Sequence, residues 1–128
     1  MTAAVERPVA AGAPPASGRE LLRQWRAACA GWRLSRGDAA KLLRIRRNQL
    51  VGTVPDAAAL PACTFRMQRL VMLARLLEER TRSPAQAARW VRFPCITDPS
   101  VTRIERLITS DPFLDATLRL LGHREKKR

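Results

Sequence analysis

Helix start signals recur at short intervals along the chain, and they constrain the fold more than any other feature of the sequence. Residues 17–20 (SGRE) form a capping box, in which serine and glutamate side chains satisfy free backbone N–H groups at the start of a helix. Further start signals occur at residues 35–38, 83–84, 98–99 and 111–112, the last three with proline. Signals at this spacing allow only short helices, so we predict an all-α fold.

Apolar residues follow each start at helical spacing, as Leu21, Trp25, Cys29 and Trp32 do after the first. The sequence has no sustained alternation of apolar and polar residues and no Asn-Gly turn between apolar runs, so strands are not expected. The pattern predicts helices over residues 17–31, 36–43, 46–54, 64–80, 83–92, 99–108 and 111–121.

Four regions follow from this pattern. Residues 1–16 are rich in alanine and proline and predict a disordered leader, and residues 123–128 predict a basic tail. Residues 17–61 and 62–122 are two helical regions, a helix-turn-helix bundle and a small C-terminal domain. The leader lacks the continuous apolar stretch of a secretory signal, and no apolar run is long enough to span a bilayer. We therefore expect a cytoplasmic protein without a membrane partner.

The net charge is the outlying quantity of the composition. Lys and Arg number 24 against 11 Asp and Glu, which gives a formal charge of +13. A small chain with this imbalance attracts polyanions, so nucleic acid is the first partner to consider and an anionic membrane surface the second. Duplex DNA is the partner that we expect. The excess is nearly all arginine, which the codon bias of a GC-rich genome also supplies. A protein-interaction adaptor that never touches DNA therefore stays an alternative.

Enzyme chemistry is not expected from the reactive side chains. Cys29, Cys63 and Cys95 are far apart and odd in number, and His123 is the single histidine. These residues cannot assemble a structural zinc site or a catalytic triad, and the sequence has no phosphate-binding glycine motif. We expect no enzymatic activity, no metal and no cofactor, and we interpret the cysteines as small buried hydrophobic residues.

Residues 36–55 (RGDAAKLLRIRRNQLVGTVP) are the most informative segment. Ala40 is small enough for two helices to cross closely, and Leu43, Ile45 and Leu50 supply the apolar residues between them. This spacing resembles the helix-turn-helix pattern, in which a second helix enters the DNA major groove. Arg44 occupies the turn position where glycine is common. Any small helical bundle also contains alanine crossings and leucine stripes, which is the alternative interpretation.

The expected second helix would begin with arginine, asparagine and glutamine side chains. Arginine can form paired hydrogen bonds with guanine, and asparagine or glutamine with adenine, while neighbouring cations contact phosphates. The candidate DNA-binding residues are Arg36, Arg46, Arg47, Asn48, Gln49, Arg23 and Lys41.

Residues 87–94 (AARWVRFP) contain the pattern Ala-x-x-Trp-hydrophobic-x-x-Pro, which Ala87, Trp90, Val91 and Pro94 match. With the preceding helix-turn-helix pattern and the two helices that follow, the order of elements resembles the Xre/MbcA/ParS-type antitoxins over roughly residues 18–122. In that family an N-terminal DNA-binding region precedes a helical toxin-binding region.

The resemblance implies an antitoxin that represses its own operon and neutralises a partner toxin, often a RES-domain enzyme that degrades NAD. It assigns residues 62–122 to toxin binding and oligomerisation, with a homodimer or higher oligomer expected. A stand-alone helix-turn-helix regulator whose second half dimerises is an alternative, and the apolar residues of this half could equally be core. The candidate partner-binding residues are Trp90, Val91, Phe93, Pro94, Phe113 and Leu114, with Ile96 beside them.

Overall fold

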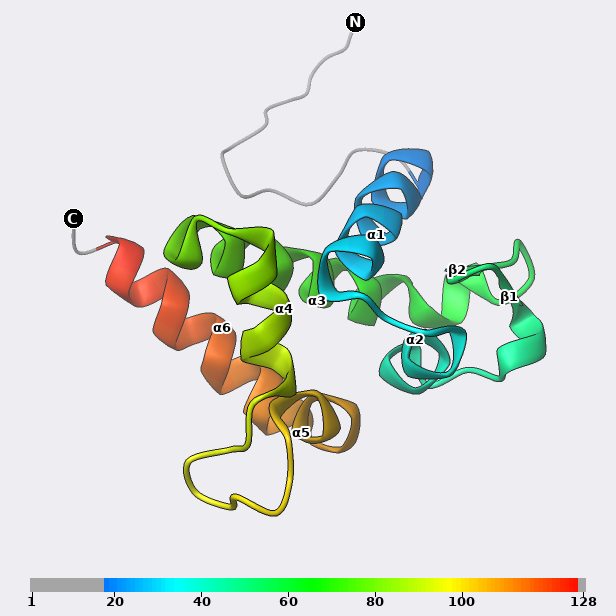
Figure 1. Cartoon of the computed structure of the whole chain (residues 1–128). Coiled ribbons are helices and arrows are strands. Elements are labelled where there is room, and N and C mark those ends of the chain that lie inside the picture. Colours follow the sequence, from blue (N-terminus) through cyan, green and yellow to red (C-terminus); the bar gives the residue numbers. More distant parts are fainter. Residues whose placement is uncertain (1–17, 127–128) are drawn as a thin grey trace, which may run out of the picture.

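A computed structural model describes residues 18–126 of the chain, and side chains over residues 18–122. This part contains six α-helices, one 3-10 turn and a two-stranded hairpin (Figure 1). The predicted helical character is confirmed, and the predicted leader over residues 1–16 lies outside the described residues. The elements are α1 (Gly18–Trp32), α2 (Arg36–Leu43), η2 (Arg47–Gln49), β1 (Leu50–Val51), β2 (Val54–Pro55), α3 (Leu60–Thr81), α4 (Pro84–Arg92), α5 (Arg103–Thr109) and α6 (Asp111–Lys126).

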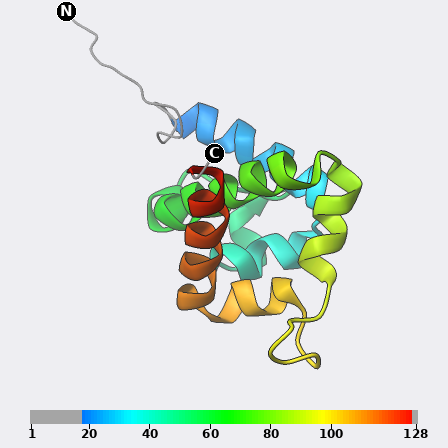
Figure 2. The same cartoon turned by 90° about the vertical axis from the view of Figure 1, so that its left-hand side faces the viewer.

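The long helix α3 is the centre of the arrangement, with α1, α4 and α6 packed along it. Helix α4 also packs on α1, and α5 links α2, α4 and α6 at one end of the molecule (Figure 1). The loop between α4 and α5 projects away from the helices, as both views show (Figure 2). Among the described helices, none is both long and apolar enough to cross a membrane.

One hydrophobic core joins the two predicted regions. Its largest side chains, Trp25 and Trp32, come from α1 and are 0% and 2% exposed. They belong to the same buried cluster as Leu73 of α3, Val91 of α4 and Leu114 of α6. The boundary expected near residue 61 therefore does not separate two cores, because residues on both sides of it bury one another.

The helix predicted over residues 46–54 is wrong. The chain instead makes the 3-10 turn η2 and then the antiparallel hairpin, in which Leu50 pairs with Pro55 and Val51 with Val54. Gly52 has φ +68°, a conformation that glycine adopts without strain, and it is the first of two loop residues. Glycine at that place is typical of a tight hairpin turn, and two β-branched valines flank it. This was the sequence signal for the hairpin.

Helix α5 starts four residues later than predicted. Asp98 does not begin a helix, because its carboxylate accepts a 2.7 Å hydrogen bond from the Ser100 hydroxyl and makes a local turn. The capping box is at Thr102 instead, whose backbone N–H donates to the Glu105 carboxylate at 2.8 Å. Helix α6 continues through Gly122 to Lys126, so most of the basic tail predicted over residues 123–128 is helical.

Candidate nucleic-acid interface

The chain turns tightly after α2, at the place where the helix-turn-helix pattern puts a glycine. Arg44 has φ 61° and ψ 43°, the left-handed conformation that ends a helix, and its backbone N–H donates to the carbonyl of Lys41 at 3.2 Å. The next residue, Ile45, donates to the Ala40 carbonyl at 3.0 Å. The turn is therefore present, but it leads into η2 and the hairpin rather than into a recognition helix.

Side chains from α1 and α2 hold η2 and the hairpin in place. The Arg36 guanidinium donates to the carbonyls of Arg47, at 2.8 Å, and Leu50, at 3.2 Å. The indole N–H of Trp25 donates to the carbonyl of Thr53 at 2.8 Å. Arg36, a predicted DNA-binding residue, thus has a structural role. Its bonds hold η2 and the start of the hairpin, and the bond from Trp25 holds the hairpin loop.

Gln49 also has a structural role. Its side-chain oxygen accepts a 2.8 Å hydrogen bond from the backbone N–H of Arg46, and its carbonyl accepts one from Asp56. The side chains of Arg46, Arg47 and Asn48 are exposed and make no hydrogen bond or ion pair within residues 18–122. Of the four polar residues predicted at the start of the second helix, these three have side chains that can reach a ligand.

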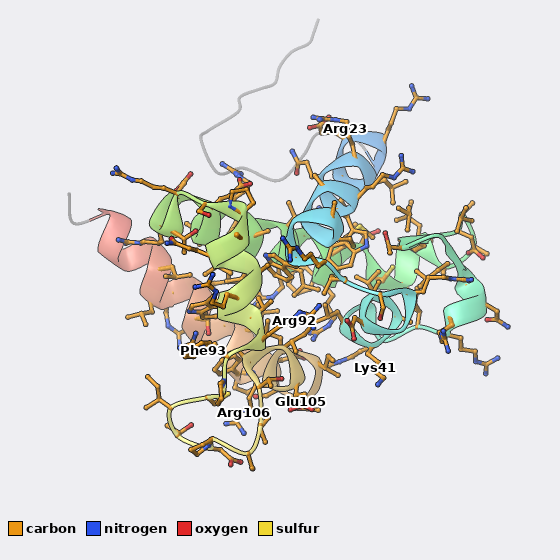
Figure 3. The ribbon with its side chains drawn as sticks, viewed as in Figure 1. Arg23, Lys41, Arg92, Phe93, Glu105 and Arg106 are labelled. Carbon is orange, nitrogen blue, oxygen red and sulfur yellow. The ribbon has the colours of Figure 1, made fainter. Side chains whose placement is uncertain are left out.

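Helix α1 carries a second group of cations. Arg19, Arg23 and Arg26 are exposed and lie within roughly 60° of one another around the helix, at about 100° per residue. Arg23 forms an ion pair with Glu20, which lowers the pKa of Glu20 and raises that of Arg23. Figure 3 shows Arg23 near the upper end of α1 and Lys41 well below it on α2, so the structure does not bring these two predicted residues together.

Other arginines bind backbone carbonyls near helix ends. The last carbonyls of a helix lack partners within it and carry partial negative charge, which a guanidinium satisfies. Arg92, for example, donates to the carbonyls of Trp32 and Arg33 at 3.2 and 2.8 Å. Much of the positive charge is therefore used inside the fold. The arginines that bind carbonyls of another element in this way are Arg44, Arg66, Arg92 and Arg103, and Arg80 binds the carbonyl of Leu121 within α6.

Arg66 is largely buried, with 12% of its side chain exposed. It donates to the carbonyls of Leu42 and Leu107, and it pairs with Asp111 at 2.6 Å. Burial lowers the pKa of Arg66, and the charge of Arg44 lowers it further. Burial alone would raise the pKa of Asp111, but the charges of Arg44 and Arg66 outweigh it and lower that pKa. This cluster ties α2, α3, α5 and α6 together.

The predicted partner-binding residues divide between the surface and the core. Phe93 is 54% exposed and Ile96 is 88% exposed, both on the loop that projects between α4 and α5 (Figure 3). Val91 and Leu114 are 0% exposed, so their prediction as partner contacts is wrong and they are core residues. Both residues are buried because α4 and α6 pack on α3.

The projecting loop is closed at its base by backbone hydrogen bonds. Pro94 pairs with Thr102 in an isolated β-bridge, the Cys95 N–H donates to Val101 at 2.8 Å, and the Arg103 N–H donates to Phe93 at 2.9 Å. These bonds hold the exposed Phe93 and Ile96 at fixed positions.

Trp90 of α4 and Phe113 of α6 are half-buried, and an arginine covers each ring. The guanidinium carbon of Arg103 lies 4.4 Å from the centroid of the Trp90 ring, and that of Arg106 lies 5.9 Å from the centroid of Phe113. Their apolar surfaces are thus less available to a partner than that of Phe93.

The three cysteines are buried and free, as predicted. Burial raises the pKa of the Cys29 thiol to about 11 and raises that of Cys63, so neither is a thiolate at neutral pH. In the described part of the chain, no three metal-binding side chains come together.

One exposed aromatic residue was not singled out from the sequence. Phe65 is 69% exposed on α3. It lies off the stripe formed by Leu70, Leu73 and Leu77, and this offset was the signal that could have identified it.

Comparison of the chain with protein-family models, curated proteins and solved structures finds no match.

Proposed function

We propose that the protein belongs to the class of small helical proteins that bind duplex DNA. The observation that carries this proposal is the fixed turn after α2. It exposes the side chains of Arg46, Arg47 and Asn48, which have no hydrogen-bond or ion-pair partner among the described residues. Lys41, exposed on α2, adds a further cation. Cations held in this way can replace the counterions of DNA phosphates.

The absence of a helix over residues 46–54 determines the mode of binding. A three-residue turn does not fill the major groove as a recognition helix does. Contacts to the DNA backbone therefore supply most of the affinity, and sequence reading is limited to the base edges that Arg47 and Asn48 reach.

Within that class, we propose an antitoxin-like repressor of its own operon that also binds a partner toxin, such as a RES-type enzyme. The resemblance of residues 87–94 to the antitoxin signature supports this proposal. The apolar residues Phe93 and Ile96 on the projecting loop give it a physical basis, because their exposure favours contact with another protein.

Fluorescence anisotropy with labelled DNA from upstream of the gene tests the DNA-binding proposal. We expect affinity to fall steeply with salt, and the Arg47→Ala variant to bind more weakly with a log–log slope shallower by about 0.9. Arg119→Ala is the matched control, since it removes the same charge from an exposed position on α6. No binding at roughly 50 mM salt, or equal effects of both variants, would contradict the proposal.

A second candidate is an adaptor that binds protein but not DNA. It is favoured by the arginines that bind backbone carbonyls, because they give the positive charge a structural use. Co-purification with the product of the adjacent gene separates the candidates. Capture of that product, with its loss in the Ile96→Ser variant and no DNA binding in the same preparation, would establish the adaptor.

A further inference from the structure

A groove of about 410 Å³ lies where the end of α2 meets the first turns of α3 and α6. This volume is within the range of roughly 300–1,000 Å³ that is usual for ligand pockets. Its apolar lining comes from Leu43, Ile45, Ala62 and Phe65. The DNA-binding and partner-binding residues proposed above do not line it, so the groove needs its own explanation.

Phe65 gives the groove an exposed apolar rim. Its side chain is 69% exposed, and the guanidinium carbon of Arg69 lies 5.3 Å from its ring centroid. Ile45, in the same groove, is half-buried. Covering such a surface is favourable by roughly 25 cal/mol for each Å² of apolar area removed from water.

The charges around the groove differ from those of the whole chain. Arg44, Arg66 and Arg69 face Asp111 and Asp115, which leaves one net positive charge against +13 for the protein. Arg44 pairs with Asp111 at 3.1 Å, and Arg69 pairs with Asp115. The two aspartate side chains remain 59% and 46% exposed. Asp111 already pairs with both Arg44 and Arg66, whereas Asp115 pairs with Arg69 and can accept a second cation.

The mixed charges around the groove indicate which molecule can bind there. Two copies with a charge of +13 repel each other, so they can associate only where the local charge is mixed. In a two-fold dimer the same patch serves both copies, and the arginines of one can face the aspartates of the other. We propose that this groove is the site at which a second copy of the chain binds, with Phe65 at its centre.

This arrangement would bring the two DNA-binding turns toward each other. Ile45 lies in the groove and is followed directly by Arg46, Arg47 and Asn48. The dimer itself requires no DNA, so its test is independent of the DNA-binding proposal.

Sedimentation equilibrium of the purified full chain tests the proposal at about 150 mM salt, where charges more than roughly 8 Å apart are screened. We expect the mass to rise with concentration from 14.3 kDa towards twice that value. Phe65→Ser and Ala62→Arg should each raise the dimer dissociation constant at least tenfold. Both residues are exposed, so circular dichroism should show the wild-type fold.

Leu120→Ser is the matched control, because it removes an apolar side chain that is 59% exposed on α6 and does not line the groove. It should leave the dissociation constant unchanged. A wild-type protein that stays monomeric up to a concentration on the order of 1 mM would overturn the proposal. So would a dimer that Leu120→Ser weakens and Phe65→Ser does not.

Discussion

Three arginines adopt backbone conformations that ordinarily favour glycine. Arg33, Arg44 and Arg82 have φ of 57°, 61° and 58°, and Arg44 and Arg82 end α2 and α3. The left-handed conformation costs a residue with a Cβ about 1–2 kcal/mol. At Arg44 the side chain offsets this cost, because it donates to the Ile108 carbonyl at 3.0 Å and pairs with Asp111. Arg82 makes no such side-chain contact among the described residues.

Replacing these two arginines with glycine should therefore have different effects. We expect Arg82→Gly to raise the free energy of unfolding by about 0.5–1 kcal/mol, because it removes the conformational cost and no contact. Arg44→Gly should give no gain, because it also removes the bonds to Ile108 and Asp111. Urea denaturation of both variants measures this difference, and equal gains would contradict the role assigned to Arg44.

The elements themselves differ in how much of them could be predicted. Helices α1, α2, α4 and α6 follow their start signals and apolar spacing, because short-range capping and amphipathicity determine them. Helix α3 follows its apolar spacing but begins at Leu60, four residues before the predicted start, without a side-chain cap. Residues 46–55 could not be assigned in this way. Leu50, Val51 and Val54 suit either a helical stripe or a short hairpin, and distant hydrogen bonds from Arg36 and Trp25 stabilise the hairpin.

Two glycine substitutions, one in the hairpin and one in α6, test the assignment of the hairpin. Gly52→Ala should destabilise the protein by about 1–2 kcal/mol, because its φ of +68° is strained for alanine although no atom lies within 4 Å of the added Cβ. Gly122→Ala is the control. It is the same substitution in equally open space within α6, where alanine should raise the free energy of unfolding by about 1 kcal/mol. Thermal unfolding compares the two, and a stabilising Gly52→Ala would contradict the hairpin.

At the scale of the whole molecule, the packing of α4 on α1 was the feature that sequence patterns could not reveal. Apolar spacing shows that Val91 and Leu114 lie on apolar faces, but it does not show whether a core or a partner covers them. The resemblance favoured a partner, and the fold buries both residues. The structural hydrogen bonds of Arg36 and Gln49, two candidate DNA-binding residues, could not be predicted for a related reason, since hydrogen-bond partners depend on the folded turn.

A chain that ends at Arg82 tests the shared core. It lacks α4, α5 and α6, so Trp32 and Leu73 would lose the apolar residues that cover them in the intact protein. We expect this chain to aggregate, or to lose its cooperative unfolding transition by circular dichroism, instead of retaining a folded DNA-binding region. A monomeric, cooperatively folded product that still binds DNA would show that the two regions are separate domains.

The contact between α1 and α4 also has a consequence for synthesis on the ribosome. Arg92 binds the carbonyl of Trp32, 60 residues earlier in the sequence. At about 5–20 residues per second, several seconds pass between the synthesis of the first helix and that of the helix that covers it. During this interval the nascent chain carries two tryptophans on an apolar helix face that α4 does not yet cover. Protection by chaperones would therefore matter most while the newly made N-terminal half waits for α4.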